Sequence, residues 1–406
     1  MAFLMTERLN WSAPDELEFD ARVISAAPRE GITEIVLDGT AFHPESGGQP
    51  CDLGLLDAAR VVHVRDDEGR VVHLVEGAAP PEGAVVRGKV DAARRLDHSC
   101  QHTAQHIVSA VALRDFGAAT VGFHLGEEAS TVDLEPALDG KDALLALEDA
   151  ANREAFVDRP VISRVVDGND RPRCRRDAAV REGEPLRVVE IEGLDVTACC
   201  GTHLARTSQV GLIRLSRTEI VRGATRVELR AGLRTLALLR RLEDLTVSLS
   251  ASTGSGPWEL PAWVEAARAE TRRLAAEAAS LRKEVAGYEA AALLSRSRIC
   301  AGGRVVAEIV PPRPPVALRE LASRVVARPG TVALLGAVWE DRAVVAFARS
   351  AELSLHMGDV MRSILPRIRG KGGGRPDMAQ GGGEDARGLA AAIESALRLV
   401  SESSHV

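Results

Sequence analysis

The sequence of 406 residues lacks any long apolar run and any dense pattern of cysteines. No stretch approaches the 18 uninterrupted apolar residues that a membrane-spanning helix needs. The first residues, MAFLMTERLNWSAPDE, become charged too early for the apolar core of a signal peptide. Six cysteines in so long a chain do not resemble a secreted disulfide scaffold. These absences predict a cytoplasmic protein with no membrane contact and with reduced thiols that are available to a metal.

The chain also lacks an excess of positive charge, since its formal net charge is -7. This charge argues against a uniformly basic coat for nucleic acid, although it can hide a local basic stripe. Nine arginines, Arg222 and Arg226 among them, lie between Leu204 and Arg241 against two acids. A second basic patch lies between residues 362 and 375. Each patch is either a solvated face or a place for phosphate contacts, and the sequence leaves both interpretations open.

The length and the 45% hydrophobic content predict several domains of mixed α+β class. Residues 1–90 hold short runs of β-branched residues broken by Gly, Pro and Asp, which predict a small antiparallel β-barrel. Residues 91–235 combine helical and strand patterns and predict an α+β domain. Helical patterns predominate in 236–296, and 297–406 alternate strands with helices in an α/β pattern.

The helical segment carries apolar residues at heptad spacing, with Leu274, Leu281 and Tyr288 seven residues apart. Four or five heptad positions suffice for a helical hairpin or a short coiled coil. Intramolecular packing is the simpler interpretation, and a homodimer through the C-terminal half is the alternative.

Two pairs of metal-type residues stand far apart in the chain, His102 and His106 in HTAQH and Cys199 and His203 in CCGTH. The spacing of each pair places both side chains on one helical face or across one turn. Either pair alone arises by chance, but together they supply the nitrogen and sulfur ligands that zinc prefers. HTAQH lacks the glutamate of a metalloprotease helix. Four protein ligands would close a structural zinc site, whereas a catalytic zinc keeps one position open, and both remain expectations.

Two further segments are rich in glycine and are predicted to be loops. The first, TAFHPESGGQPCDLG, covers Thr40–Gly54. The second, GKGGGRPDMAQGGG, covers Gly370–Gly383, between a strand and a helix. Such loops let backbone N–H groups approach a phosphate or a base, and the alternative for the second is a flexible linker.

Taken in order, the motifs TAFHPESGGQ, HTAQH, GFHLG, CCGTH and GGGRPDMAQGGG resemble the long form of the freestanding alanyl-tRNA editing proteins. These proteins are relatives of the editing and C-terminal parts of alanyl-tRNA synthetase. The resemblance extends from about Asp38 to the final helix. No class II aminoacylation domain precedes the motifs, so the resemblance implies an editor that acts in trans.

The resemblance also assigns roles to residues. It implies that His102, His106, Cys199 and His203 bind Zn2+. It implies that Gln49 and Thr40 act in the editing pocket, Thr40 near the aminoacyl side chain. The C-terminal glycine motif matches a DHH-associated domain implicated in tRNA binding. The residues expected to contact nucleic acid are therefore Gly372, Gly373, Gly374, Arg375, Gln380, Gly381 and Gly382, with Arg222 and Arg226.

Three positions depart from the family pattern. His43 and Ser46 stand where the family usually has Tyr and Gly, and Cys200 replaces the first Gly of CGGTH. The spacing to His203 and the motif both favour Cys199 over Cys200 as the ligand.

The implied reaction is hydrolysis of the ester that joins a wrong amino acid, Ser or Gly, to the end of tRNA(Ala). Two alternatives fit the same motifs. One is a zinc-stabilised tRNA-binding module without catalysis, and the other is an aminoacyl-ester hydrolase with altered specificity. A DHH-type phosphoesterase is disfavoured because no Asp-His-His cluster is present.

Overall fold

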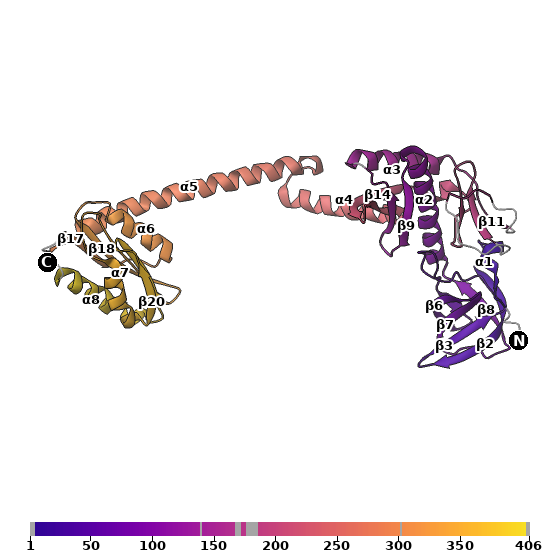
Figure 1. Ribbon diagram of the computed structural model, residues 1–406, viewed down its shortest axis with the longest axis horizontal. Helices are drawn as coiled ribbons and strands as arrows, with labels where there is room; N and C mark the ends of the chain where they lie inside the picture. Colours follow the sequence, from indigo (N-terminus) through magenta and orange to yellow (C-terminus); the bar gives the residue numbers. More distant parts are fainter. Residues whose placement is uncertain (1–4, 139, 167–171, 176–185, 301–302, 403–406) are drawn as a thin grey trace. The chain divides into compact units, whose positions relative to one another are not determined.

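A computed structural model describes residues 5–138, 140–166, 172–175, 186–300 and 303–402. The chain divides into two compact units, which we call the first unit, Met1–Ala251, and the second unit, Ser252–Val406 (Figure 1). The fold is of mixed α+β class, as the sequence predicts, while the four-domain division stays a prediction. None of the described helices is both long and apolar enough to cross a membrane.

Six antiparallel strands of the first unit close into a ring through their backbone hydrogen bonds. Alternation of side chains explains how the ring encloses a core: one strand buries Val86, Gly88 and Val90 while the residues between them are exposed. A short parallel pair, β1 (Glu7–Arg8) with β4 (Gly39–Thr40), lies outside the ring. In ring order, the strands are β2 (Glu18–Arg29), β3 (Ile32–Leu37), β7 (Arg70–Glu76), β6 (Ala59–Asp67), β5 (Gly54–Leu56) and β8 (Val85–Val90).

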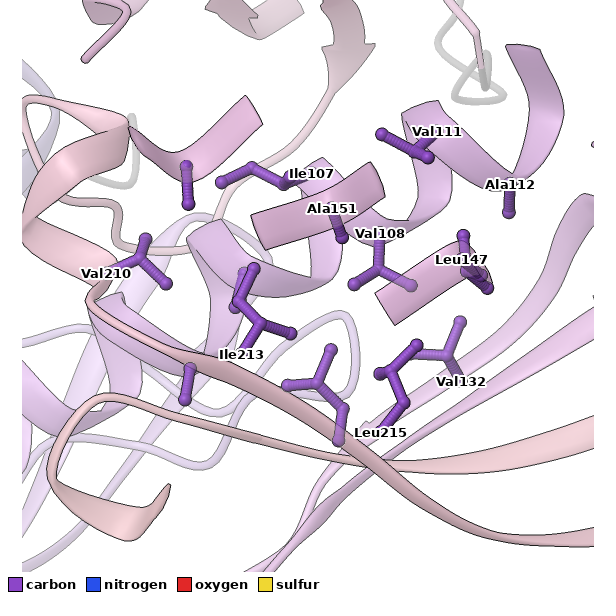
Figure 2. Close-up of a cluster of buried hydrophobic side chains, with 14 of the residues drawn as sticks. Ile107, Val108, Val111, Ala112, Val132, Leu147, Ala151, Val210, Ile213 and Leu215 are labelled. Carbon is purple, nitrogen blue, oxygen red and sulfur yellow. The ribbon is translucent and has the colours of Figure 1, made fainter. Parts of the chain in front are cut away.

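The central helix of the first unit, α2 (Ala92–Phe116), follows the ring directly. The Asp91 carboxylate accepts a hydrogen bond from Arg94 N at its start, and Gly117 ends it in the left-handed conformation. Ile107, Val108 and Val111 of α2 pack into one apolar core with a second helix and a sheet (Figure 2). These partners are α3 (Gly140–Phe156) and the sheet β14 (Ile213–Val221), β15 (Ala224–Ala231), β10 (Ser130–Glu135) and β9 (Ala119–Leu125).

A separate three-stranded antiparallel sheet leads into the CCGTH segment. Its strands are β11 (Val161–Val166), β12 (Leu186–Ile191) and β13 (Asp195–Ala198), in that order. The CCGTH segment begins directly after β13 and is neither helix nor strand. The short helix α1 (Leu9–Ser12) lies near β11.

Two long helices follow the first unit's sheets, as the sequence predicts. They are α4 (Leu233–Thr253) and α5 (Leu260–Ser295), separated by a short turn at Pro257–Glu259. Leu274, Leu281 and Tyr288 on α5 are exposed, so the homodimer stays a prediction.

The second unit is built on one six-stranded sheet with helices on both faces. One face packs against α6 (Pro315–Val325) and the end of α5, and the other against α7 (Met357–Ile364) and α8 (Leu389–Glu402). Both faces of the central strands are therefore buried, which explains their continuous apolar runs. The strand order is β16 (Arg298–Cys300), β17 (Gly303–Ile309), β18 (Thr331–Trp339), β19 (Arg342–Arg349), β21 (Met378–Gly383) and β20 (Gly370–Gly374).

The prediction of a loop over Gly370–Gly383 is wrong. The segment forms two paired antiparallel strands, β20 and β21, joined by a turn at residues 375–377. Close backbone approach explains the glycines: a Cβ on Gly374 would lie 2.3 Å from the carbonyl oxygen of Met378, and one on Gly372 would lie 2.5 Å from Gly381 Cα. Glycine-rich composition suggested a loop, but pairing with β19 makes the segment part of the sheet.

Candidate metal centre

The structure brings the two metal-type pairs together. Helix α2 places His102 and His106 one turn apart, and the turn after β13 supplies Cys199 and His203. One ligand atom from each of the four lies within 4.8 Å of the others. Cys199 Sγ is 3.5 Å from His102 Nε2 and 3.3 Å from His203 Nε2. The four side chains therefore form a group that could hold a metal ion.

Gln49 fixes the orientation of the His102 ring. The Gln49 amide oxygen accepts from the backbone N–H of Thr202 at 3.1 Å, so this oxygen, and not the NH2 group, faces His102. His102 Nδ1 lies 2.8 Å from the same oxygen and must donate to it. The amide nitrogen of Gln49 donates to Thr202 Oγ1 at 2.9 Å. His102 Nε2 is therefore left with a lone pair for a metal.

Oxygen atoms also lie near Nδ1 of the other two histidines. His106 Nδ1 lies 3.3 Å from a carboxylate oxygen of Asp195, which Arg175 binds through two nitrogens at 2.7 and 2.9 Å. His203 Nδ1 lies 3.4 Å from Thr103 Oγ1, whose own proton goes to the Ser99 carbonyl. A carboxylate or oxygen behind each imidazole is the usual outer contact of a metal-binding histidine. The contact of His203 is the longest of the three.

Gly201 is required by the close approach of these groups. A Cβ at this position would lie 2.2 Å from His102 Cε1 and 2.7 Å from Gln49 Oε1. Its backbone N–H also points at Cys199 Sγ, at 3.4 Å. The glycine of CCGTH is therefore explained by the space that His102 and Gln49 occupy.

The protonation of the group suits metal binding. Burial alone would raise the pKa of the Cys199 thiol, but the neighbouring His102 and His203 hold it well below its usual value. Burial, together with His102, lowers the pKa of His203 to about 3, so its imidazole is neutral near pH 7. Burial works against protonation of His106, yet Asp195 and Cys199 raise its pKa. Thiolate and neutral imidazole are the forms in which cysteine and histidine bind metals, so binding would release the proton that the raised pKa of His106 favours.

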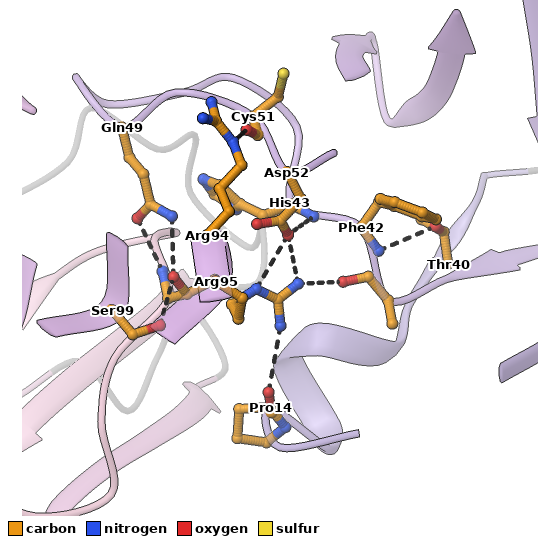
Figure 3. A network of polar contacts seen from close by, with 12 residues as sticks. Pro14, Thr40, Phe42, His43, Gln49, Cys51, Asp52, Arg94, Arg95 and Ser99 are labelled. Atoms are coloured by element: carbon orange, nitrogen blue, oxygen red, sulfur yellow. Dashed lines mark hydrogen bonds and ion pairs between the residues drawn. The ribbon is translucent and has the colours of Figure 1, made fainter. Parts of the chain in front are cut away.

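The loop Thr40–Gly54, which carries Gln49, is clamped by a buried ion pair (Figure 3). The Arg95 guanidinium on α2 binds the Asp52 carboxylate and also donates to the Ala41 carbonyl. The same carboxylate accepts from the backbone N–H of His43 at 2.7 Å. The loop that carries Gln49 is therefore bound to α2, the helix that carries His102 and His106.

Thr40 lies in the same loop but has other partners. His73 Nδ1 faces the Ile35 carbonyl at 3.2 Å, so His73 Nε2 accepts the Thr40 hydroxyl proton at 2.9 Å. The backbone N–H of Phe42 donates to Thr40 Oγ1 at 3.1 Å. No contact joins Thr40 to the metal group among the described residues, so the structure unites Gln49, and not Thr40, with the four ligand-type side chains.

Comparisons with known proteins show similarity over most of the chain. Residues 186–228, which include Cys199 and His203, match the Threonyl and Alanyl tRNA synthetase second additional domain, and residues 302–402 match the DHHA1 domain. The alanine–tRNA ligase of Methanosarcina barkeri is 32% identical over 98% of this chain and 44% of its own length. The enzyme of Methanothrix thermoacetophila is 33% identical over 97% of this chain and 44% of its own length.

The two family models and the ligases show that the chain is related to alanyl-tRNA synthetase over nearly its whole length. It spans less than half of the length of these ligases. A solved structure, the C-Ala domain of Aquifex aeolicus alanyl-tRNA synthetase, is 25% identical, with 26% of this chain and 95% of that chain covered and a TM-score of 0.24. The predicted resemblance to relatives of alanyl-tRNA synthetase is confirmed by the family models and the ligases.

Two of the departures from the family pattern lie side by side. Ser46 Oγ is 3.5 Å from His43 Nε2, and His43 is fully buried. Burial, together with Arg95, lowers the pKa of His43 well below its usual value. The third departure, Cys200, is exposed and is not one of the four clustered residues.

Most of the arginines predicted to contact nucleic acid between residues 204 and 241 are paired with acids. Arg226 binds Asp133 through two nitrogens at 2.7 and 2.8 Å and lies 3.7 Å from Glu219. Arg222 is exposed, lies at the turn between β14 and β15, and has no ion pair within the described part of the chain. Four more of these arginines form ion pairs: Arg206 with Asp158, Arg214 with Glu148, Arg230 with Glu228 and Arg234 with Asp97.

The glycine motif places its predicted residues in one hairpin of the second unit. Gly372 pairs with Gly381, and Gly373 pairs with Gln380. Arg375 lies exposed in the connecting turn, and the Gln380 residue is exposed as well. Gly374 and Gly382 complete the two strands. The motif is therefore a hairpin at the edge of the sheet, and its exposed residues include both glycines and the side chains of Lys371, Arg375 and Gln380.

Sequence reasoning missed the residues that contact Nδ1 of the ligand-type histidines. Asp195 stands four residues before Cys199, and Thr103 directly follows His102. Their proximity to ligand-type residues was the available signal, because outer contacts often come from the same segments. The role of Gly201 depends on atoms of α2 and could not be read from CCGTH alone.

Proposed function

We propose that this chain is a zinc-containing aminoacyl-tRNA hydrolase that deacylates mischarged Ser-tRNA(Ala), with Gly-tRNA(Ala) as a further substrate. The observation that carries the proposal is the group of His102, His106, Cys199 and His203, with ligand atoms within 4.8 Å of one another. Three imidazoles and a thiolate match the ligands that zinc prefers. The family supports tRNA as the partner.

The contacts behind the ligands support a resident metal. Each of the three imidazoles has an oxygen near Nδ1, and His102 and His203 direct Nε2 toward Cys199 Sγ. A bound zinc would supply a Lewis acid that polarises a carbonyl oxygen or a water. Gln49 acts as a positioning residue in this proposal, because both ends of its amide are engaged with His102 and Thr202.

His203 is the ligand that we propose exchanges during the reaction. It lines a cavity, together with Trp11 and Leu204, and the other three ligand-type residues do not line this cavity. A catalytic zinc needs one position for water or substrate, and the residue next to a cavity is the one that can provide it.

We keep Thr40 as the proposed basis for sparing alanine, although it is fully buried and has no contact with the metal group among the described residues. Its proton goes to His73 and one lone pair takes the Phe42 N–H, so one lone pair of the hydroxyl has no partner in these contacts. A site that needs a hydroxyl partner rejects a substrate that lacks it by roughly ten-thousandfold. We propose that the glycine hairpin and Arg222 contribute to binding the rest of the tRNA.

A deacylation assay on Ser-, Gly- and Ala-tRNA(Ala), with metal content measured on the same sample, tests the function. Zinc-loaded protein should release Ser and spare Ala, and His102→Ala combined with His106→Ala should abolish both bound metal and release. His356→Ala, an exposed histidine of the second unit, is the control. If zinc-loaded protein releases no amino acid, the chain is a tRNA-binding module; equal release of Ala would indicate an altered specificity.

A further inference from the structure

Arg187 is a buried cation without an acid partner. It lies on β12 and is 3% exposed. Its Nη1 donates to the carbonyl oxygens of Cys199 and Gly201, each at 2.8 Å, and its Nε is buried with no partner. No carboxylate forms an ion pair with it within the described residues.

The other buried charged side chains of the described chain are compensated. Arg95 binds Asp52, Asp195 binds Arg175, and Glu154 binds two arginines. A buried charge is expensive, and two carbonyl contacts neutralise none of it. The nearby Cys199 thiolate opposes the lowering of the Arg187 pKa by burial, and burial still outweighs it. The ring of Trp11 lies 5.9 Å from the Arg187 guanidinium carbon and offsets only part of the cost.

Arg187 lines a cavity that ends at the metal group. The cavity has a volume of about 240 Å3, and its wall includes Trp11, Arg187 and His203. A second hollow of about 810 Å3 shares Trp11, Ser12 and Ser163 with it and is also lined by Arg8 and Arg164. All of these residues belong to the first unit. Asp15 also lines the cavity and Glu7 the second hollow, and Arg8 and Arg164 are paired with Asp66 and Glu190. Among the described residues, Arg187 is therefore the arginine of this wall without a carboxylate partner.

We propose that Arg187 and Trp11 form a binding subsite for a backbone phosphate of the single-stranded 3′ end of the tRNA. This inference rests on the proposed function and specifies how its substrate is held. The aminoacyl group of such a substrate carries a cationic ammonium, so its anionic part is the phosphodiester backbone next to the ester. A guanidinium fork matches phosphate geometry, and a bound dication would add to the positive charge at this wall.

Single-stranded RNA ends are commonly bound by aromatic and arginine side chains, which suits the composition of this cavity wall. Arg187 also reaches the backbone of Cys199 and Gly201. The phosphate would thus be held one side chain away from the segment that carries His203, which places the adjoining ester near the metal group.

Binding of uncharged tRNA(Ala) by fluorescence anisotropy, with and without its terminal CCA, tests the subsite without any hydrolysis. Arg187→Gln should weaken binding of the intact tRNA about ten- to a hundredfold, the range for a hydrogen bond to a charged group. The slope of log K against log salt should fall by about 0.7 for one phosphate of a single strand. Binding of the tRNA without CCA should stay unchanged.

Arg29→Gln is the matched control, because Arg29 is exposed and lies 3.7 Å from Glu34; it should alter neither the affinity nor the slope. Arg187→Lys keeps the charge without the fork, and it should fold, retain metal and bind the intact tRNA with intermediate affinity. The proposal is overturned if the wild-type protein binds both RNAs equally. It is also overturned if Arg187→Gln weakens both RNAs alike, or lowers metal content with no change in salt slope. The proposed hydrolase fails on a different observation, the absence of amino acid release.

Discussion

The interiors of the two units differ in what they contain. All but two of the buried polar side chains of the described chain lie in the first unit, and the two exceptions are Thr331 and Ser350. In the first unit, the candidate functional residues are buried and are oriented by hydrogen bonds to other side chains. Gln49, for example, accepts a hydrogen bond from His102. In the second unit, the candidate surface is a hairpin of glycines. The orientation of the residues in the first unit therefore depends on their hydrogen-bond partners. The hairpin of the second unit depends on glycines, which let its two strands approach closely.

The largest expected effect tests the contacts behind the metal group. Gln49→Ala and Asp195→Asn should each lower zinc affinity about ten- to a hundredfold, because each removes an oxygen that orients an imidazole. Competition with a chromophoric chelator measures this affinity. Asp133→Asn is the control, since Asp133 also binds an arginine through two nitrogens but lies outside the metal group. Unchanged affinity in both variants would contradict the assigned positioning roles.

The glycine hairpin should be sensitive to a single methyl group. Gly374→Ala should destabilise the second unit by about 1 to 3 kcal/mol, because its Cβ would lie 2.3 Å from the Met378 carbonyl oxygen. Gly373→Ala is the matched control, since its Cβ would meet nothing within 4 Å. Denaturant unfolding measures both, and zinc content should not change in either. Equal stability of the two variants would argue against close strand approach as the reason for the glycine.

The first unit should lose stability in acid through His73. Burial lowers the pKa of His73 from 6.5 to about 4, so the unfolded chain binds more protons between these values. Stability is therefore fully present above pH 6.5 and is lost as pH falls toward 4, by about 2 kcal/mol at pH 5. Unfolding of the wild type and of His73→Gln at pH 7.5 and pH 5 gives the difference. If the two proteins lose the same stability between these pH values, His73 is not the source.

The smallest expected effect is a difference in tRNA binding between variants of two arginines of the first unit. Arg222→Gln should weaken tRNA binding a few-fold and lower the salt slope by about 0.7 to 0.9, since this exposed arginine has no ion pair in the described chain. Arg226→Gln should lower the slope less, because Asp133 already binds its guanidinium. Binding titrations at several salt concentrations compare them. A larger change for Arg226 would reverse the assignment.

Helical patterns over 236–296 predicted the two long helices α4 and α5. The helix α2, which carries His102 and His106, lies in the region where helical and strand patterns were mixed, whereas β14, β15 and α7 were not predicted. The loop predicted over Gly370–Gly383 failed because glycine is permissive, so the long-range pairing of β21 with β19 decided its conformation. Thr40 and Gln49 were assigned to one pocket, yet only Gln49 contacts the metal group among the described residues.

The sequence by itself determined which residue types are available to a metal ion, because residue type and spacing fix which atoms could bind zinc. It also determined the family, through motifs in a fixed order. Only the tertiary structure decided which groups contact Nδ1 of the ligand-type histidines. It also decided which arginines of the described residues have no carboxylate partner. Asp195 behind His106, Gln49 behind His102 and the unpaired Arg187 all depend on contacts between segments that are distant in the chain. The spacing of residues within one segment does not predict such contacts, since they are set by how the strands and helices pack.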